Sequence, residues 1–202
     1  MKKITIALIM VISLIAPIQT MAESVTQNGT IIEPLEQNIE QIIDEITSEP
    51  RPINSDAIQN VKEYISEYFG NLGYDNIEYQ KFEYNDENNE NAIRHSSQAD
   101  VFLASTAEDA IVDGIGENII VTKNSSIDTT KNLIISAHYD SAEDSVGAND
   151  NGSGVAAVLE LARILKDTEI PYNIKFILFS GEEKYMLGSR WYVGKLTEKK
   201  KK

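Results

Sequence analysis

The 202-residue sequence contains no cysteine, so disulfide bonds and a lipid-modified cysteine are both excluded. Basic residues are also scarce, because 18 Lys and Arg face 32 Asp and Glu, for a net charge of −14. A chain this acidic is a poor partner for nucleic acid or for an anionic membrane surface. If it is exported, a chain without disulfides depends on its core, or on bound metal, for stability.

The longest apolar run lies at the N-terminus. Lys2 and Lys3 precede an almost unbroken apolar stretch over 4–18, and Thr20-Met-Ala22 supplies the small residues that a signal peptidase requires. The stretch is shorter than the roughly 20 residues that span a bilayer. We therefore predict a signal peptide at residues 1–22, a secreted, extracellular protein and no membrane association after cleavage. A retained membrane anchor is the alternative.

Without its signal peptide the chain keeps 180 residues and a net charge of −16, which suits one domain with a real core. Residues 23–34 are polar and lack periodicity, which predicts a flexible N-terminus. Residues 35–202 form the predicted domain. Its expected elements are helices over 35–46 and 55–70, strands at 77–84, 101–103, 118–122 and 132–137, a helix capped by Ser153, a strand at 173–179 and a helix from 184. Strands alternating with helices, with all-apolar central strands, are typical of an α/β fold covered on both faces.

Polar side chains with catalytic potential follow two of these strands and one glycine-rich loop. His138 and Asp140 follow one apolar strand, Glu182 and Glu183 follow another, and Asp150 lies in the Gly-Ala-Asn-Asp-Asn-Gly-Ser-Gly loop before a helix. Such groups collect at the carboxyl ends of strands in open α/β sheets. His offers a neutral nitrogen to zinc, Asp can bridge two cations, one Glu can bind a second metal and the other can take a proton from water. This combination predicts a hydrolytic metal site.

Each motif also has a plain structural explanation. A histidine can simply end a strand, a glutamate pair is favoured at a helix N-terminus by the helix dipole, and a glycine-rich loop can be an ordinary tight turn. Three such coincidences in order are improbable together, so the shared site is the preferred interpretation.

The three motifs, in this order and at this spacing, resemble the M28 family of zinc metallopeptidases, here of the secreted bacterial aminopeptidase type. The resemblance covers roughly Asn118 to Val193 and, more loosely, most of the mature chain. It implies a three-layer α/β/α sandwich with a mixed, mostly parallel sheet. It also implies a hydrolase, an aminopeptidase that removes N-terminal residues from peptide substrates with Zn²⁺, two ions per complete site. Lys184-Tyr-Met186 departs from the family pattern, which usually carries a glycine there.

The resemblance assigns a role to each motif residue. It implies that His138 binds the first zinc and that Asp140 is the carboxylate orienting the site beside it. It implies that Asp150 bridges the two zinc ions, that Glu182 is the general base and that Glu183 binds the second zinc.

The resemblance also implies two further ligands, an Asp and a His, beyond the glutamate pair. No histidine follows His138, and His95 lies upstream in a polar stretch where a surface residue is expected. We therefore expect that the chain, which ends in lysines at 199–202, is truncated and its domain incomplete at the C-terminal end. A naturally short protein with a basic tail is the alternative.

Three functions follow from these observations. The first is a zinc aminopeptidase, the second an inactive remnant that binds peptides or has no activity, and the third a glutaminyl cyclase-like acyltransferase with a single zinc. Cobalt and manganese are alternatives to zinc by affinity and geometry. Neither the preferred N-terminal residue nor the oligomeric state can be read from the sequence.

Overall fold

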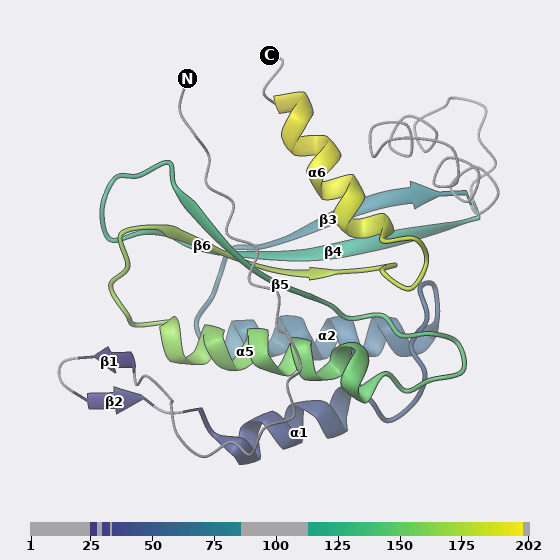
Figure 1. Cartoon of the computed structure of the whole chain (residues 1–202), viewed down its shortest axis with the longest axis horizontal. Helices are drawn as coiled ribbons and strands as arrows, with labels where there is room; N and C mark the ends of the chain where they lie inside the picture. The colour runs from purple at the N-terminus through teal and green to yellow at the C-terminus, as the bar shows by residue number, and fades with distance from the viewer. Residues whose placement is uncertain (1–24, 28–29, 33, 86–112, 200–202) are drawn as a thin grey trace.

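A computed structural model shows a four-stranded sheet with helices on both sides (Figure 1). The residues that it describes are 25–27, 30–32, 34–85 and 113–199. The signal peptide predicted at 1–22, His95 and the strand predicted at 101–103 lie outside them.

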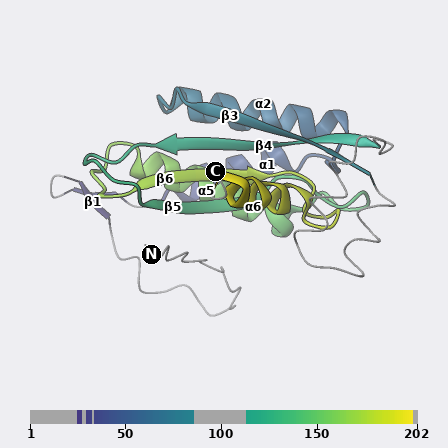
Figure 2. The same ribbon diagram turned by 90° about the horizontal axis from the view of Figure 1, so that it is seen from above.

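The sheet has the strand order β3-β4-β6-β5, which Figure 2 shows from above. β3 (Ile77–Tyr84) pairs antiparallel with β4 (Gly114–Lys123), and β4 pairs antiparallel with β6 (Asn173–Phe179). β6 pairs in parallel with β5 (Asn132–His138). The sheet is therefore mixed, as predicted, but two of its three described pairs are antiparallel, so the described part is not mostly parallel as the resemblance implied. Its only parallel pair within the described residues, β5 with β6, ends in His138 and leads to the glutamates.

The sheet lies between two helical layers. α1 (Glu36–Ile46), α2 (Asp56–Asn71) and α5 (Ser153–Leu165) lie on one side, and α6 (Leu187–Lys199) lies on the other (Figure 1). β6, which is apolar apart from Asn173 and Lys175, is buried at four of its seven positions because both of its faces are covered. The core on the three-helix side includes Ile42, Ile46, Ile58, Ile65, Phe69, Ile119, Val121, Val155, Leu159, Phe176 and Leu178. These layers confirm the predicted three-layer α/β/α sandwich.

Local sequence signals explain several element boundaries. α2 begins after Ser55, whose side-chain oxygen accepts a hydrogen bond from the Ile58 N–H at 3.1 Å, as an N-cap does.

α1 is anchored to α5 by buried Glu160, whose carboxylate accepts from the Leu35 N–H at 2.9 Å and the Asn38 amide at 2.6 Å. Arg163 neutralises the same carboxylate at 2.7 Å, so the buried charge is paired and hydrogen-bonded.

Four features differ from the sequence prediction. β4 begins at Gly114 and not at 118, because its pairing with β3 continues to Tyr84. Ser153 is the first residue of α5 and not its cap, because a turn, η1 (Ala148–Gly152), in which Asp150 and Asn151 have non-helical φ and ψ, leads directly into the helix. α6 begins at Leu187 and not near 184, because a tight turn follows the glutamate pair. A small hairpin, β1 (Val25–Gln27) with β2 (Thr30–Ile32), lies within the segment predicted to be flexible.

None of the helices in the described part of the chain is long and apolar enough to cross a membrane. A retained anchor within residues 1–22 is not tested by this finding.

Candidate functional site

The predicted site residues meet at the carboxyl ends of β5 and β6. These strands are parallel neighbours in which His138 lies opposite Phe179, so His138 and the turn that carries Glu182 reach the same edge of the sheet. Asp150 arrives from η1, which begins after the loop that follows β5. Topology therefore joins the three motifs as the sequence predicted.

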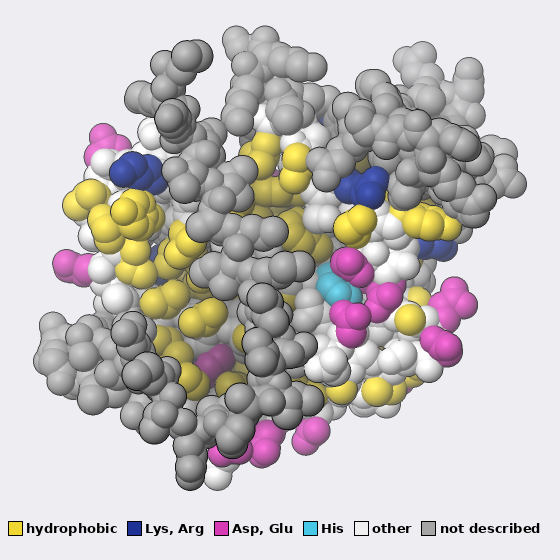
Figure 3. Space-filling model, in the orientation of Figure 1, with side chains coloured by type: hydrophobic (Ala, Val, Ile, Leu, Met, Phe, Trp, Pro, Cys, Tyr) yellow, Lys and Arg dark blue, Asp and Glu magenta, His cyan; other side chains and the backbone are white. Residues whose placement is uncertain are grey.

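The imidazole of His138 lies at the centre of this group. Its Nε2 is 3.0 Å from Asp150 Oδ1 and 3.8 Å from Glu182 Oε2. Its Nδ1 is 3.3 Å from the backbone oxygen and 3.5 Å from Oδ1 of Asp140. Figure 3 shows acidic side chains gathered around this histidine at the molecular surface.

Asp140 is a buried link between the two strand ends. Its Oδ1 accepts a hydrogen bond from the backbone N–H of Glu182 and its Oδ2 from that of Glu183, both at 3.1 Å. Only 1% of Asp140 is exposed, and its carboxylate also neighbours Nδ1 of His138. One side chain thus sets the orientation of the imidazole and the position of both glutamates.

The acidic surroundings change the acid–base behaviour of the site. Burial by itself lowers the pKa of His138, but the hydrogen bond with Asp140, the charges of Asp140 and Glu182 and the bond with Asp150 together raise it to about 9. Burial and the charge of Asp150 raise the pKa of Glu183, which His138 partly offsets. Glu183 therefore belongs electrostatically to the same group.

The donor atoms fit a zinc site in chemistry. One imidazole nitrogen and several carboxylate oxygens are ligands that zinc accepts, and their summed negative charge favours a divalent cation. Within the described residues, however, no three His, Asp or Glu side chains form a ready-made ligand group. His138 Nε2 and Asp150 Oδ1, two of the proposed ligand atoms, contact each other directly at 3.0 Å.

The loop from β5 to η1 is wrapped around Arg51, which the sequence patterns did not single out. Arg51 is completely buried, and its Nε donates to the Tyr139 oxygen at 2.7 Å, its Nη2 to the Gly147 oxygen at 3.1 Å and its Nη1 to the Val146 oxygen. Its backbone N–H donates to Ser141 Oγ at 2.9 Å, and its backbone oxygen accepts from the Ser141 N–H at 3.2 Å. Burial lowers the pKa of Arg51, whereas Asp140 raises it.

Asn118 holds the turn that carries the glutamate pair. Its amide nitrogen donates to the Gly188 oxygen at 2.9 Å and to Gln80 Oε1 at 3.0 Å, while its oxygen accepts from the Ser180 N–H at 3.1 Å. Gly188 is needed here, because a side chain would meet Asn118 and the Ser180 backbone. The signal in the sequence was an asparagine directly before the apolar residues 119–121; in the structure Asn118 lies within β4 and is buried.

The turn after the glutamates adopts a backbone shape that favours glycine. Tyr185 has φ 66° and Met186 has φ 57°, both in the left-handed region. The turn is closed by a hydrogen bond from the Met186 N–H to the Glu182 oxygen at 2.8 Å. The Lys184-Tyr-Met186 departure from the family pattern therefore places a non-glycine residue in a glycine-type conformation.

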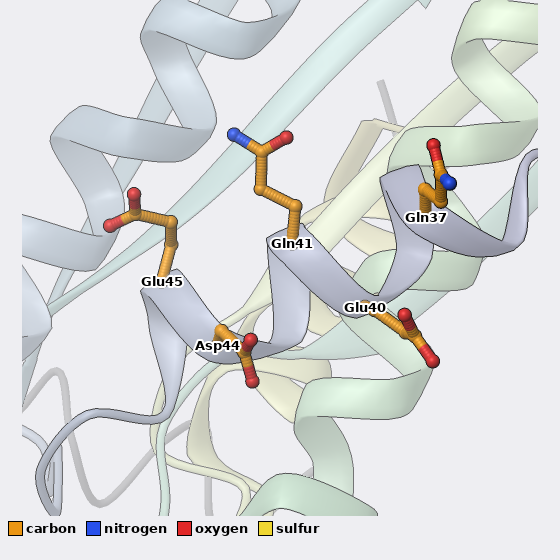
Figure 4. Close-up of a pocket in the computed structure, with 5 residues that line it drawn as sticks. All are labelled: Gln37, Glu40, Gln41, Asp44 and Glu45. Carbon is orange, nitrogen blue, oxygen red and sulfur yellow. The ribbon is translucent and has the colours of Figure 1, made fainter.

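A separate surface depression lies on α1 (Figure 4). Its lining residues are Gln37, Glu40, Gln41, Asp44 and Glu45. All five come from one helix and none is a predicted site residue, so this depression is not part of the candidate site.

The segment that carries this site is similar to a known protein family. The family model of peptidase family M28 matches residues 118–202, the segment that contains most of β4, all three motifs and α6. The matched segment, residues 118–202, belongs to peptidase family M28. This confirms the family predicted from the motifs.

Two curated relatives are similar to this chain. Aminopeptidase YwaD of Bacillus subtilis is 44% identical over 94 residues, which cover 46% of this chain and 21% of that protein. A vacuolar membrane protease of Schizosaccharomyces japonicus is 31% identical over 150 residues, covering 73% of this chain and 16% of that protein.

A solved zinc aminopeptidase of Bacillus subtilis, BSAP, has the same fold. It superposes with a TM-score of 0.61 at 17% identity, over 78% of this chain and 64% of that chain. Because the match spans only 21% and 16% of the lengths of these two curated relatives, the activity of a whole M28 protein is a proposal for this chain. The zinc-binding and catalytic roles of the motif residues likewise stay predictions.

Proposed function

We propose that this chain acts in the zinc-dependent removal of N-terminal residues from peptides, with two zinc ions at the site. The observation that carries the proposal is the approach of Asp150 and Glu182, from two separate loops, to the same nitrogen of His138. Similarity to aminopeptidase YwaD supports the choice of reaction.

The proposed ligands are His138 through Nε2 for the first zinc, Asp150 for both ions and Glu183 for the second. Zinc bound there would polarise the scissile carbonyl and stabilise the negative charge that develops on its oxygen. The Nδ1 side of His138 stays engaged with Asp140, which keeps Nε2 directed at the ligand position.

Glu182 is the proposed general base. Its side chain is 39% exposed, so it can reach substrate and water, while its backbone N–H is held by buried Asp140. In this role its carboxylate accepts a proton from the attacking water and returns it to the departing amino group. Proton transfer at a defined position requires a carboxylate that is accessible but carried by a fixed backbone, and Glu182 has both properties.

Secretion and peptide substrates form part of the same proposal. The predicted signal peptide at 1–22 and the acidic composition support an extracellular enzyme without nucleic-acid partners. The name of the S. japonicus relative places that protein at a vacuolar membrane, so recovery of this chain in a membrane fraction is the competing outcome.

Metal content and hydrolysis of Leu-p-nitroanilide, with and without added Zn²⁺, test the proposal. We expect zinc-dependent release of the amino acid, and we expect Glu182→Gln to keep its zinc while losing about 10²–10⁴-fold in rate. Glu169→Gln, a matched change on an exposed loop, should leave both unchanged.

Other results would point elsewhere. Zinc binding without any hydrolysis would favour the inactive remnant. Formation of pyroglutamate from an N-terminal glutaminyl peptide, without release of free amino acids, would favour the cyclase-like acyltransferase. Undiminished hydrolysis by Glu182→Gln would contradict the assigned base.

A further inference from the structure

We propose that Arg51 is a positioning residue that shapes the loop over 139–147 and thereby brings Asp150 to His138. The inference rests on the proposed function, because the loop joins the proposed zinc ligands. Arg51 itself contacts neither His138 nor Asp150 through any hydrogen bond in the described residues, so its action is through the loop.

The contacts of Arg51 define the loop from the inside. Its guanidinium donates to three main-chain oxygens, those of Tyr139, Val146 and Gly147, and Ser141 pairs with its backbone. A guanidinium is a rigid planar fork with five N–H donors, so it fixes the relative positions of its acceptors. Opening the loop would leave buried carbonyl groups and a buried cation without partners, which is costly.

Arg51 donates hydrogen bonds to both ends of the loop. Tyr139 lies between His138 and Asp140, and Gly147 begins the approach to η1. Gly147 has φ 58°, and a side chain on it would stand 2.6 Å from the Asp150 backbone oxygen, so the chain is closely folded there. Holding these two ends together sets the 3.0 Å separation of Asp150 Oδ1 from His138 Nε2.

The charge of Arg51 and its positioning role predict opposite changes in zinc affinity when Arg51 is replaced. Asp140 and Glu183 both act electrostatically on Arg51, so its positive charge is close enough to oppose a nearby cation. If charge alone mattered, Arg51→Met would bind zinc more tightly. If positioning dominates, Arg51→Met and Arg51→Lys both bind zinc more weakly, since lysine keeps the charge but lacks the fork.

The experiment measures two properties of the purified chain. Zinc affinity is measured by competition with a chromophoric chelator, well below the unfolding temperature of each variant. Backbone hydrogen exchange is followed by mass spectrometry over 139–150 and, for comparison, over α2. Arg163→Lys is the matched control, because Arg163 pairs with Glu160 beside α1.

We expect both Arg51 variants to bind zinc 10–100-fold more weakly than the parent chain. We also expect faster exchange over 139–150 with unchanged protection in α2, and no change in zinc affinity for Arg163→Lys. Unchanged or tighter zinc binding by Arg51→Met would overturn the proposal.

Two further outcomes are decided by the same measurements. If the parent chain binds no zinc, the proposed function fails, while exchange over 139–150 still decides whether Arg51 shapes the loop. If neither Arg51 variant folds, Ser141→Ala removes the acceptor of the Arg51 N–H together with the two bonds that Ser141 Oγ donates to the Ala142 and Ser145 oxygens. Loosened exchange over 139–150 in that variant supports the proposal, and unchanged exchange overturns it.

Discussion

A protonated His138 should stabilise the metal-free chain. Its pKa is raised from 6.5 to about 9 in the folded state, because the surrounding carboxylates outweigh the effect of burial. At 1.36 kcal/mol per pKa unit, this difference contributes about 3 kcal/mol to the free energy of unfolding. Since whole domains are stable by only about 5–15 kcal/mol, the effect is large enough to measure.

The direction of the pH dependence follows from the sign of the shift. The folded state binds the proton more tightly than the unfolded state, so the contribution is complete below pH 6.5. It is lost as the pH rises from 6.5 to about 9, where the folded imidazole also releases its proton.

Urea unfolding in the presence of a chelator, at pH 6 and at pH 9.5, measures this contribution. Between the two pH values, the free energy of unfolding of the parent chain should fall by about 3 kcal/mol more than that of His138→Gln, because glutamine cannot titrate. The chain has two histidines, so His95→Gln identifies the remaining imidazole resonance in a proton NMR titration. An imidazole of His138 that titrates at or below pH 6.5, or an equal pH dependence in His138→Gln, would refute the reasoning.

Two further predictions concern the site. Asp140→Asn replaces one of the two carboxylate acceptors by an N–H donor that faces a backbone N–H. The free energy of unfolding in urea should therefore fall by about 2–3 kcal/mol, and the pKa of His138 should fall as well. Asp144→Asn, an exposed change in the neighbouring loop, should do neither. Tyr185→Gly should raise the free energy of unfolding by up to about 1 kcal/mol, since it relieves a left-handed conformation that costs about 1–2 kcal/mol. Tyr185→Ala should give no such gain, and equal stability of the two variants would contradict this.

Much of the fold could be predicted from local patterns. The strands at 77–84 and 173–179 and the helix after Ser55 were predicted because alternation, apolar runs and caps are properties of neighbouring residues. The direction of strand pairing is a property of distant segments. The antiparallel placement of β4 between β3 and β6 therefore had no local signature.

Turns were harder to predict than strands. Ser153 resembles a helix cap in the sequence, but in the structure its N–H donates to the Ala148 oxygen and its hydroxyl donates to the Asn149 oxygen at 2.8 Å, so it accepts no capping bond. The start of α6 was placed too early because Tyr185 and Met186 adopt a conformation that neither residue type signals. In both places the long-range packing of the site decided the local structure.

The convergence of the candidate site residues was predictable because the proposed chemistry restricts residue type. A proton acceptor or metal ligand must be His, Asp or Glu, so His138 and Glu182 stand out in the sequence even though their roles are still predictions. Arg51 and Asn118 bind main-chain groups, and any loop offers such groups, so no motif announces them.

These observations divide the site into two sets of residues with different consequences. The exposed carboxylates of Asp150 and Glu182 can meet a ligand, whereas Asp140, Arg51 and Asn118 are buried and fix the loops and turns from which those carboxylates project. Substituting the first set should change chemistry at a nearly constant geometry. Substituting the second should change geometry while every reacting group is still present, which explains why metal affinity and hydrogen exchange, and not activity alone, distinguish them.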